Sequence, residues 1–309
     1  MSALRIGTRG SALALTQAGY VKTLLAERCP GLEAEITVVR VSGDSPSAGA
    51  GEDKRRWVDA IEDALLRGAI DLAVHSAKDV PGELTDGLQL LGAPPRAAVE
   101  DVLCGAEDLD ALGASARIGT SSLRRAAQLR AAREDLDVVT MGGNVDTRLR
   151  ILAQGKLDAI VLARAGLHRL GREDAIGAVL DPARFVPAPG QGTLALEARA
   201  EDSSAREAVA AILDADTSAC LLAERALASA LNASCHTPLG AYATPAGCGC
   251  LELRGWVGLP DGSTWIADEL LGGFYDPVSL GRRVAERMDL AGAGDLLQRA
   301  EEMATGADV

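Results

Sequence analysis

The stretch Pro187–Glu197, PAPGQGTLALE, decides the fold that this sequence predicts. Its first part, Pro187–Gly192, is rich in proline and glycine, which favour a loop, and the apolar run Thr193–Glu197 that follows favours a strand. We interpret Arg184–Gly192 as a connection between two lobes, and Thr193–Glu197 as a strand that returns to a sheet begun near the N-terminus. The first lobe would therefore be built from two separate pieces of the chain.

On the N-terminal side of that stretch, short apolar runs alternate with helical segments, which is typical of α/β units on a parallel sheet. Before the break at Ala93-Pro94-Pro95, the pattern predicts strands at Leu4–Gly7, Ala34–Val41 and Asp71–Val74, and helices at Ser11–Arg28 and Trp57–Leu66. After the break, it predicts strands at Ala116–Gly119, Asp137–Thr140 and Ala159–Leu162, and helices at Ser122–Ala132 and Val145–Ala153. Two similar α/β lobes are therefore expected.

From Thr217 onward the pattern changes to a helix, three β-like runs and two further helices, which indicates a smaller α+β domain. The β-like runs are Ala241–Thr244, Cys250–Leu259 and Ser263–Leu271. A chain of 309 residues is long enough for two or three domains. We therefore predict an α/β lobe at 1–94 with 193–213, a second α/β lobe at 98–188, and a C-terminal α+β domain at 216–309.

The composition argues against several classes of partner. A net charge of −13 disfavours nucleic acid and anionic membranes. No apolar run has membrane-spanning length, and residues 1–15 lack the long apolar stretch of a signal peptide, so we expect a cytoplasmic protein. Six cysteines in such a chain do not suggest a disulfide framework. The spacing of Cys248 and Cys250 fits no usual zinc pattern, so we expect no metal.

Four loops that follow predicted strands share one design, in which Ser, Thr or Gly is combined with Arg or Lys. They are Thr8–Ser11, His75–Asp79, Gly119–Arg125 and Gly142–Arg148. In open α/β sheets, ligands bind beyond the carboxyl ends of the strands, and free N–H groups at helix starts hold anions. Nearly all the positive charge is arginine, whose planar fork grips carboxylates. The four loops together predict a cleft for a polyanion, although each alone could be a helix cap or a solvated arginine face.

Two residues stand out as candidates for chemistry. Cys235 lies on the small-residue turn of Ala233–Tyr242, ASCHTPLGAY, where an exposed thiol can become a thiolate nucleophile. A free cysteine is also commonly a small buried hydrophobe. Asp79 is a lone carboxylate in a basic loop, and it could stabilise a cation that forms during a reaction or make a structural salt bridge with Lys78. The residues alone leave these alternatives open.

Seven segments, in this order, resemble motifs of the hydroxymethylbilane synthase (porphobilinogen deaminase) family of tetrapyrrole biosynthesis. The segments are RIGTRGSALAL with Gln17, AVHSAKDVP, IGTSSLRRAAQL, GNVDTRL, DAIVLARAGLHRLG, PAPGQGTLALE and CHTPLGAYA. They span the chain from Arg5 to about Ala243, and the strings HSAKDVP and GTSSLRR are highly specific. The resemblance implies two periplasmic-binding-protein-like (type II) α/β lobes around a cleft, plus a smaller C-terminal α+β domain that holds a cofactor cysteine.

The resemblance also implies an activity and a cofactor. The family's enzymes are transferases that join four porphobilinogen molecules head to tail, release ammonia each time, and then free the linear tetrapyrrole hydroxymethylbilane by hydrolysis. Their cofactor, dipyrromethane, is built from two substrate units and would be attached here through a thioether to Cys235. Because every pyrrole carries an acetate and a propionate, the growing chain gathers carboxylates that arginine forks suit. The resemblance further suggests a monomer.

Carried over position by position, the resemblance assigns roles to residues of this chain. Asp79 would be catalytic, because its carboxylate could stabilise the cation left by loss of ammonia and handle pyrrole N–H protons. The cofactor would be held by Cys235 (covalently), Lys78, Asp79, Thr120, Ser122, Arg124, Arg125, Asn144 and Arg148. The substrate would be held by Arg9, Ser11, Arg148, Arg169 and Gln191.

Two departures from the family pattern bear on turnover. Gly142 stands where the family usually has an arginine before GN, so a charge that faces the substrate is missing unless Arg164 supplies it. The segment Glu52–Ala60 replaces the family's GGKGLFVKE. It keeps Lys54 and Trp57 in plausible places but brings acidic residues to a site for anions.

These departures favour an alternative function, that of a divergent paralogue that binds pyrrole polycarboxylates with little or no turnover. The intact Asp79, Arg124, Arg125 and Cys235 favour the active enzyme, which is our leading interpretation because catalysis is a property of site residues rather than of fold. A third interpretation, a bilobed solute-binding protein, would require an export signal.

Overall fold

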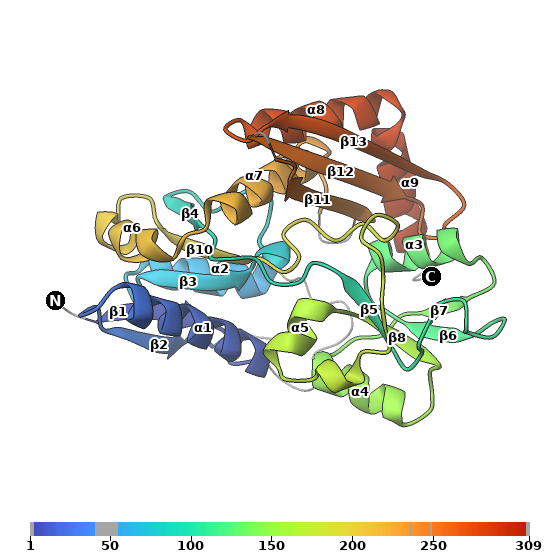
Figure 1. Cartoon of the computed structure of the whole chain (residues 1–309), viewed down its shortest axis with the longest axis horizontal. Coiled ribbons are helices and arrows are strands. Elements are labelled where there is room, and N and C mark those ends of the chain that lie inside the picture. The colour runs from blue at the N-terminus through green and yellow to red at the C-terminus, as the bar shows by residue number, and fades with distance from the viewer. Residues whose placement is uncertain (1–2, 41–54, 235–236, 248, 307–309) are drawn as a thin grey trace.

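The computed structural model describes residues 3–40, 55–234, 237–247 and 249–306. These residues form two five-stranded sheets and one three-stranded sheet. The two larger sheets lie side by side, and the sheet of the C-terminal residues lies above them in the view of Figure 1.

The first sheet has the strand order β2-β1-β3-β10-β4. Its strands are β1 (Leu4–Thr8), β2 (Ala34–Val38), β3 (Leu72–Ser76), β4 (Leu88–Gly92) and β10 (Leu194–Arg199). The associated helices are α1 (Ala12–Arg28), α2 (Arg55–Leu66) and α6 (Ser203–Val209), which is followed by the 3₁₀ turn η3 (Ala210–Ile212). On one face of the sheet, Val21 and Leu25 of α1 are buried against Ile6 and Leu72.

Strand β10 lies between β3 and β4 and is antiparallel to both, with Leu194 opposite Ser76. The prediction that the stretch after Gly192 returns a strand to the first sheet is therefore confirmed. The expectation of a parallel sheet is wrong at this strand. The physical reason is that β10 arrives from the other lobe and so enters the sheet from the opposite end.

The second sheet has the strand order β7-β6-β8-β5-β9. Its strands are β5 (Asp101–Cys104), β6 (Arg117–Gly119), β7 (Asp137–Val139), β8 (Ala159–Ala163) and β9 (Ala178–Val179), and its helices are α3 (Leu123–Ala132), α4 (Val145–Ala153) and α5 (Arg164–Arg169), with the 3₁₀ turn η2 (Glu173–Ala175). Strands β6, β7 and β8 are parallel, whereas β5 is antiparallel to both of its neighbours. The two large sheets thus repeat one arrangement, as the expected pair of α/β lobes requires.

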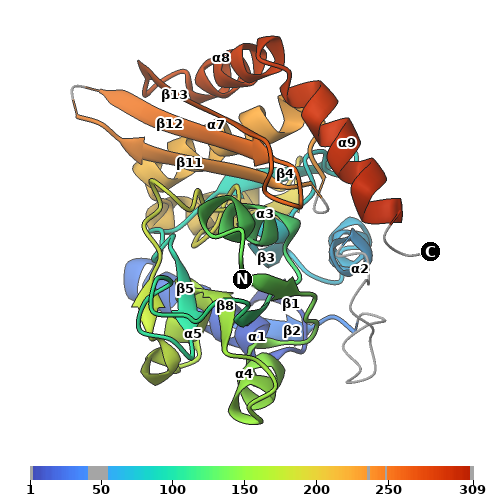
Figure 2. The same cartoon turned by 90° about the vertical axis from the view of Figure 1, so that its right-hand side faces the viewer.

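The C-terminal region begins with α7 (Ala215–Ala230) and continues through β11 (Leu239–Pro245), β12 (Cys250–Gly258), β13 (Trp265–Gly273), α8 (Pro277–Leu290) and α9 (Ala293–Gly306). The predicted order of one helix, three β-like runs and two helices is confirmed. Leu227 of α7, Leu253 of β12 and Val284 of α8 share one core. Figure 2 shows α8 on one side of this sheet and α3 of the second lobe on the other. There Trp256 of β12 packs against Ala127 of α3.

Two segments, 93–100 and 180–193, cross between the first and second sheets. Glu224 of α7 is fully buried and fastens the C-terminal region to both crossings. Its carboxylate accepts hydrogen bonds from Nη1 of Arg96 at 2.6 Å and from the backbone N–H of Gly190 at 2.6 Å. One side chain therefore ties α7 to the place where the lobes are joined.

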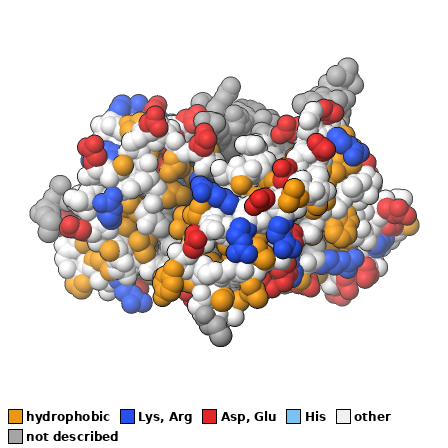
Figure 3. All heavy atoms as spheres, turned by 90° about the horizontal axis from the view of Figure 1, so that it is seen from above, with side chains coloured by type: hydrophobic (Ala, Val, Ile, Leu, Met, Phe, Trp, Pro, Cys, Tyr) orange, Lys and Arg blue, Asp and Glu red, His pale blue; other side chains and the backbone are white. Residues whose placement is uncertain are grey.

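No helix of the described segments is both long and apolar enough to cross a membrane. On the face seen in Figure 3, basic side chains are interspersed with acidic and apolar ones. This mixed surface accompanies a net charge of −13 for the whole chain.

Candidate active site

A small cavity of about 90 Å³ lies beyond the carboxyl ends of β1 and β3. Arg9, Ser11 and Asp79, all predicted from the sequence, line it together. Thr8, Gln17, Trp57, His75 and Ser76 are also among its lining residues. Parallel strands end at the same edge of a sheet, so two loops that are far apart in sequence meet here. The structure thereby brings a cation, a hydroxyl and a carboxylate into one small space.

Local hydrogen bonds explain why the first loop takes this shape. Ser11 has extended backbone angles and caps α1, because its hydroxyl accepts a hydrogen bond from the backbone N–H of Ala14 at 3.3 Å. Gln17, one turn further along α1, donates from Nε2 to the hydroxyl of Ser76 at 2.7 Å. The guanidinium of Arg9 lies over the ring of Trp57, 3.8 Å from its centroid. This stacking holds Arg9 flat on one wall of the cavity.

Asp79 ends the 3₁₀ turn η1 (Ala77–Asp79), which follows β3 directly. The connection from the other lobe passes very close to this turn at Gly190, whose φ is +72°. A Cβ at Gly190 would lie 2.8 Å from the Cβ of Ala77 and 3.1 Å from the backbone nitrogen of Lys78. Glycine is therefore required both by the backbone angle and by the space. The proline- and glycine-rich stretch thus supports the turn that carries Asp79.

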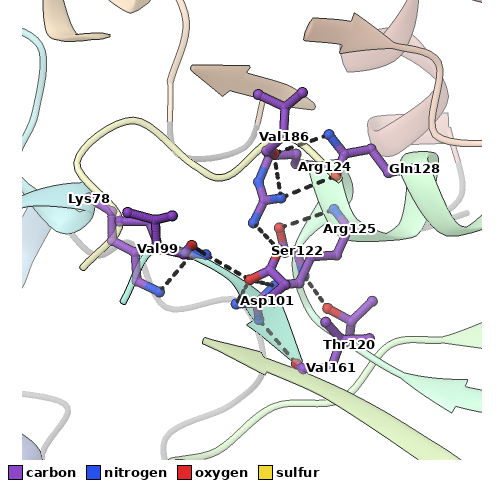
Figure 4. A network of polar contacts seen from close by, with 11 residues as sticks. Lys78, Val99, Asp101, Thr120, Ser122, Arg124, Arg125, Gln128, Val161 and Val186 are labelled. Carbon is purple, nitrogen blue, oxygen red and sulfur yellow. Dashed lines mark hydrogen bonds and ion pairs between the residues drawn. The ribbon is translucent and has the colours of Figure 1, made fainter. Parts of the chain in front are cut away.

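A continuous polar network links the two lobes across this connection (Figure 4). Lys78 donates from Nζ to Oε1 of Gln191 at 3.4 Å. Gln191 is fully buried, and its Nε2 donates to the backbone oxygen of Val99 at 2.7 Å and to Oδ1 of Asp101 at 2.8 Å. Lys78 and Gln191, which the resemblance assigned to cofactor and substrate, are thus connected to the first residue of β5.

The carboxylate of Asp101 holds Arg124 and Arg125, both of which are buried on α3. Arg124 donates from Nη2 to Oδ2 at 2.8 Å, and Arg125 donates from Nη2 and Nε to Oδ1 at 2.7 and 3.1 Å. Burial alone would raise the pKa of Asp101, but the two guanidinium groups lower it well below the ordinary range. Burial lowers the pKa of Arg124, and Asp101 opposes that effect.

Other donors of these two arginines bind backbone oxygens, whereas Nε of Arg124 is buried without a hydrogen-bond partner among the described residues. Arg124 also donates to the backbone oxygen of Val186 at 2.8 Å, and Arg125 donates to that of Val161 at 3.1 Å. Asp101 was not among the residues singled out from the sequence. One carboxylate, that of Asp101, thus faces the two positive charges of Arg124 and Arg125, which the resemblance assigned to a ligand, so the protein compensates them only in part. A binding role for this pair stays a prediction.

Arg148 and Arg169 differ from that pair, because neither forms an ion pair with any described residue. Arg148 of α4 donates to the backbone oxygen of Gly143 at 2.8 Å and to the hydroxyl of Ser121 at 2.9 Å. Arg169, at the end of α5, donates to the backbone oxygen of Gly192 at 2.7 Å. Burial lowers the pKa of each to about 10, and for Arg148 the charge of Arg125 lowers it further. An anionic ligand would remove this cost, so the two residues fit a group rich in carboxylates.

Three predicted ligand residues serve as helix caps or turn residues. The hydroxyl of Ser122 accepts from the backbone N–H of Arg125 at 3.4 Å, and Oδ1 of Asn144 accepts from that of Thr147 at 2.9 Å. The hydroxyl of Thr120 accepts from the N–H of Ser122 at 3.2 Å. The alternative that such residues are helix caps is confirmed for Ser122 and Asn144. Contacts of all three with a cofactor stay predictions.

Cys235, the predicted attachment point, lies outside the described residues, as does Lys54. Gly240 of β11, which follows Cys235 in the sequence, is close to the connection between the lobes. A Cβ at Gly240 would lie 2.7 Å from the backbone oxygen of Val186. Two other cysteines, Cys104 and Cys220, are buried, and burial raises their thiol pKa to about 11 and about 12. These two thiols are therefore poor nucleophiles at neutral pH.

The two departures from the family pattern lie in different places. Trp57, of the altered segment Glu52–Ala60, lines the cavity of Asp79. Gly142 lines a separate, open cavity of about 580 Å³, together with Arg117, Lys156 and Asp158. Arg164, the candidate to supply the charge of the missing arginine, forms an ion pair with Glu100 at 3.2 Å between Nη1 and Oε1. The charge of Arg164 is therefore directed at a neighbouring carboxylate.

Comparison with known proteins extends these findings over almost the whole chain. Residues 4–207 match the family model described as porphobilinogen deaminase, dipyromethane cofactor binding domain, and residues 218–289 match that of the porphobilinogen deaminase C-terminal domain. Proteins named porphobilinogen deaminase from Trichlorobacter lovleyi and Deinococcus radiodurans are 43% and 41% identical over 300 and 310 residues. These alignments cover 96% and 98% of this chain, and 96% and 100% of the relatives.

Among solved structures, the methionine-binding protein MetQ matches 67% of this chain and 87% of its own, with 13% identity and a TM-score of 0.42. A TM-score this low does not establish that the two folds are related. The predicted fold class, two α/β lobes with a smaller C-terminal α+β domain, is confirmed by the strand orders themselves and by the match of the C-terminal family model.

Proposed function

Because this chain belongs to the porphobilinogen deaminase family, we propose that it is a hydroxymethylbilane synthase. This enzyme is a transferase that joins four porphobilinogen molecules head to tail, with release of ammonia, to give the linear tetrapyrrole hydroxymethylbilane. The observation that carries the proposal is the pair Arg148 and Arg169, two half-buried cations without a carboxylate partner among the described residues. A substrate in which every ring brings two carboxylates supplies the missing negative charge.

Dipyrromethane is the cofactor that this family implies, and the residues present fit it. When bound, it supplies the pyrrole carbon on which the chain grows. We propose that Cys235 holds it through a thioether. Its carboxylates would be held by Lys78, Thr120, Ser122, Arg124, Arg125, Asn144 and Arg148. The lowered pKa of Arg148 is the structural support, since a carboxylate nearby would stabilise its guanidinium.

Arg9, Ser11, Arg169 and Gln191 are proposed to bind the substrate. Arg9 and Ser11 line the same cavity as Asp79, so a porphobilinogen held by them has its reacting carbon near that carboxylate. Loss of ammonia leaves an electron-poor methylene-pyrrole cation, and the carboxylate of Asp79 stabilises that positive charge. The same carboxylate can accept a pyrrole N–H proton as the new bond forms.

The alternative of a binding paralogue without turnover is not favoured. Asp79, Arg9 and Ser11 are assembled in one cavity, and the relatives matched over nearly their full length carry the enzyme's name.

Further proposals concern the oligomeric state, the location and the domains of the enzyme. We propose a monomer in the cytoplasm without a nucleic-acid partner, supported by the net charge of −13. We also propose domains at 1–94 with 193–213, at 98–188 and at 216–309, supported by the three sheets.

The experiment that tests the function is the intact mass of the purified protein beside a Cys235→Ser variant. We expect the wild-type mass to exceed that of the polypeptide by two deaminated porphobilinogen units, and the variant to lack this excess. Cys29→Ser is the matched control and should keep it, because Cys29 only donates weakly to the backbone oxygen of Ala208. An unmodified wild-type mass, even after incubation with porphobilinogen or preformed product, would reject the proposal.

The role of Asp79 is tested separately by Asp79→Asn. The variant should keep its fold and its cofactor but lose about 10²- to 10³-fold in kcat, because a neutral amide cannot stabilise the developing cation. Turnover per cofactor-loaded molecule is the measurement. A rate close to that of the wild type would remove Asp79 from this role.

A further inference from the structure

The segment that follows Asp79 is bound by an arginine from the C-terminal region. Arg225 of α7 donates from Nη1 to the backbone oxygen of Val80 at 3.2 Å. Its Nη2 donates to the backbone oxygen of Pro81 at 2.6 Å and to that of Gly82 at 3.0 Å. One guanidinium therefore binds three consecutive carbonyl groups, immediately after the proposed catalytic carboxylate.

Val80 and Leu84 pack in one apolar cluster, whereas the residues between them add little that fixes the backbone. Pro81 has no backbone N–H, and Gly82 is the residue type with the greatest backbone freedom. Val80 donates its own N–H back to the oxygen of Ala77 at 3.2 Å, which closes the turn of Asp79 but leaves the following carbonyls to other donors. Arg225 supplies those donors, so the path of the chain after Asp79 depends on it.

Arg225 is partly buried, and its guanidinium donates to three backbone oxygens. Burial lowers its pKa, and the negative charge of Glu197 acts in the opposite direction. A buried cation requires compensating dipoles, and the three carbonyl oxygens provide them. Loss of the guanidinium removes the donor that links these three carbonyl groups to α7, and at the exposed Gly82 water can take its place.

A second residue of the same helix face supports the turn from its other side. Leu221 lies four residues before Arg225 on α7, and side chains at this spacing are neighbours on a helix. Leu221 is buried in one cluster with Ala77 and Val80, which flank Asp79 in sequence. The helix α7 thus contacts the turn before Asp79 through Leu221 and the segment after it through Arg225.

We propose that Arg225 is a positioning residue for Asp79, so that the C-terminal region orients the catalytic carboxylate as well as carrying the cofactor cysteine. This inference rests on the proposed function and extends it. Arg225 is not among the residues that line the cavity of Asp79, so it would act through the turn. Its removal should therefore lower kcat and leave KM for porphobilinogen nearly unchanged.

The variant to make is Arg225→Met, which keeps the length of the side chain, together with Arg225→Lys, which keeps its charge. The matched control is Arg130→Met. Arg130 also joins the C-terminal region to a lobe. It donates to the backbone oxygens of Pro260 at 2.7 Å and Val138 at 2.8 Å, and neither residue belongs to the segment that follows Asp79.

Each holoenzyme is assayed for kcat and KM per cofactor-loaded molecule, with loading taken from the intact mass. We expect Arg225→Met to lose about 10- to 100-fold in kcat with KM changed less than about threefold, since small misplacement of a catalytic group is sufficient for such losses. Arg225→Lys should be intermediate, and Arg130→Met should match the wild type. In an Asp79→Asn background, Arg225→Met should add little further loss. Full additivity there, or an equal loss in Arg130→Met, would overturn the proposal.

Hydrogen exchange of the backbone amide of Val80, whose N–H donates to the oxygen of Ala77, provides a readout that does not need activity. Exchange should accelerate in Arg225→Met and stay slow in the wild type and in Arg130→Met. An unchanged exchange rate in Arg225→Met contradicts the positioning role, whether or not the protein turns over porphobilinogen. A wild type that lacks both cofactor mass and turnover rejects the proposed function alone, so the two failures are distinguishable.

Discussion

Two pairs of arginines in the second lobe lie on neighbouring elements, yet the protein treats them differently. Arg124 and Arg125 are buried against Asp101, whereas Arg148 and Arg169 donate only to neutral oxygens of the described residues. The sequence motifs suggested the same task for all four, that of gripping ligand carboxylates. The difference shows that a basic string from a motif can hold the fold together. The cations most available to a ligand are those for which the protein provides no counter-charge.

The largest effect that follows from this comparison is on stability. Asp101→Asn removes the negative charge between two buried guanidinium groups, and we expect it to lower the free energy of unfolding by about 3–5 kcal/mol. Urea unfolding of the wild type and the variant measures this difference. Asp146→Asn is the control, because its ion pair with Arg172 is exposed and should contribute less than about 1 kcal/mol.

A second variant separates charge compensation from simple loss of packing. When Asp101→Leu is combined with Arg124→Met and Arg125→Met, no buried charge is left unpaired, and most of the lost stability should return. If the triple variant is as unstable as Asp101→Asn, the cluster contributes through its geometry and not through its charge balance.

The next largest effect is on binding and turnover. Arg148→Gln and Arg169→Gln remove cations that the protein itself does not compensate, so each should reduce kcat/KM for porphobilinogen by about 10- to 100-fold, the loss expected for a charge-assisted hydrogen bond. Unfolding free energies should change by less than about 1 kcal/mol. Steady-state kinetics and urea unfolding of the same samples give both numbers. A large loss of stability without a loss of kcat/KM would place these residues with Arg124 and Arg125.

A smaller effect is expected on the unfolding free energy at acid pH, where the cluster of Asp101 with Arg124 and Arg125 loses its stabilising charge. The pKa of Asp101 is lower in the folded protein than in the unfolded chain, so its contribution to stability is fully present above about pH 4 and decreases as the pH falls below that value. Between pH 4 and pH 3 the wild type should lose about 1 kcal/mol more than the triple apolar variant. If the wild type and the triple variant lose the same unfolding free energy between the two pH values, the lowered pKa of Asp101 is contradicted.

The smallest effect is expected for Gly142→Arg, which restores the residue usual in the family. Gly142 lines a cavity with Arg117, Lys156 and Asp158, apart from the cavity of Asp79, so an added arginine there lies away from the proposed catalytic carboxylate. If the missing arginine limits the enzyme, kcat should rise, and we expect a change below about threefold. Steady-state kinetics measure it, and unchanged values would show that the chain does without a charge at this position.

Much of the fold was predictable because its signals are local. The helices at α1, α3 and α4 begin at Ser11, Ser122 and Asn144, whose side chains cap them, and a short polar residue before a periodic run is visible in sequence. The returning strand β10 was predicted from a proline- and glycine-rich loop followed by an apolar run. By contrast, β4 and β5 were not predicted, since such short runs have no periodicity that separates them from buried coil.

Only those residues of the site that lie within the recognised motifs could be predicted from the sequence. The assembly of Arg9, Ser11 and Asp79 in one cavity follows from parallel strands that end at one edge of a sheet. The ion pair between Asp101 and Arg124 could not be predicted, because it joins β5 to α3, and β6 lies between these two elements in the sequence. One signal was present, since Asp101 begins the apolar run Val102–Cys104, where an acidic residue must be buried and therefore paired.

The position of β10 between β3 and β4 has a consequence for the order in which the protein is made. The ribosome delivers β1 to β4 first, but the middle of that sheet stays open until residues 194–199 emerge. Until then β3 and β4 expose strand edges, which are templates for aggregation. The second sheet uses one continuous stretch, 101–179, and can close earlier. Folding during synthesis should therefore start in the middle of the chain, and the N-terminal residues must wait for a chaperone or for the later strand.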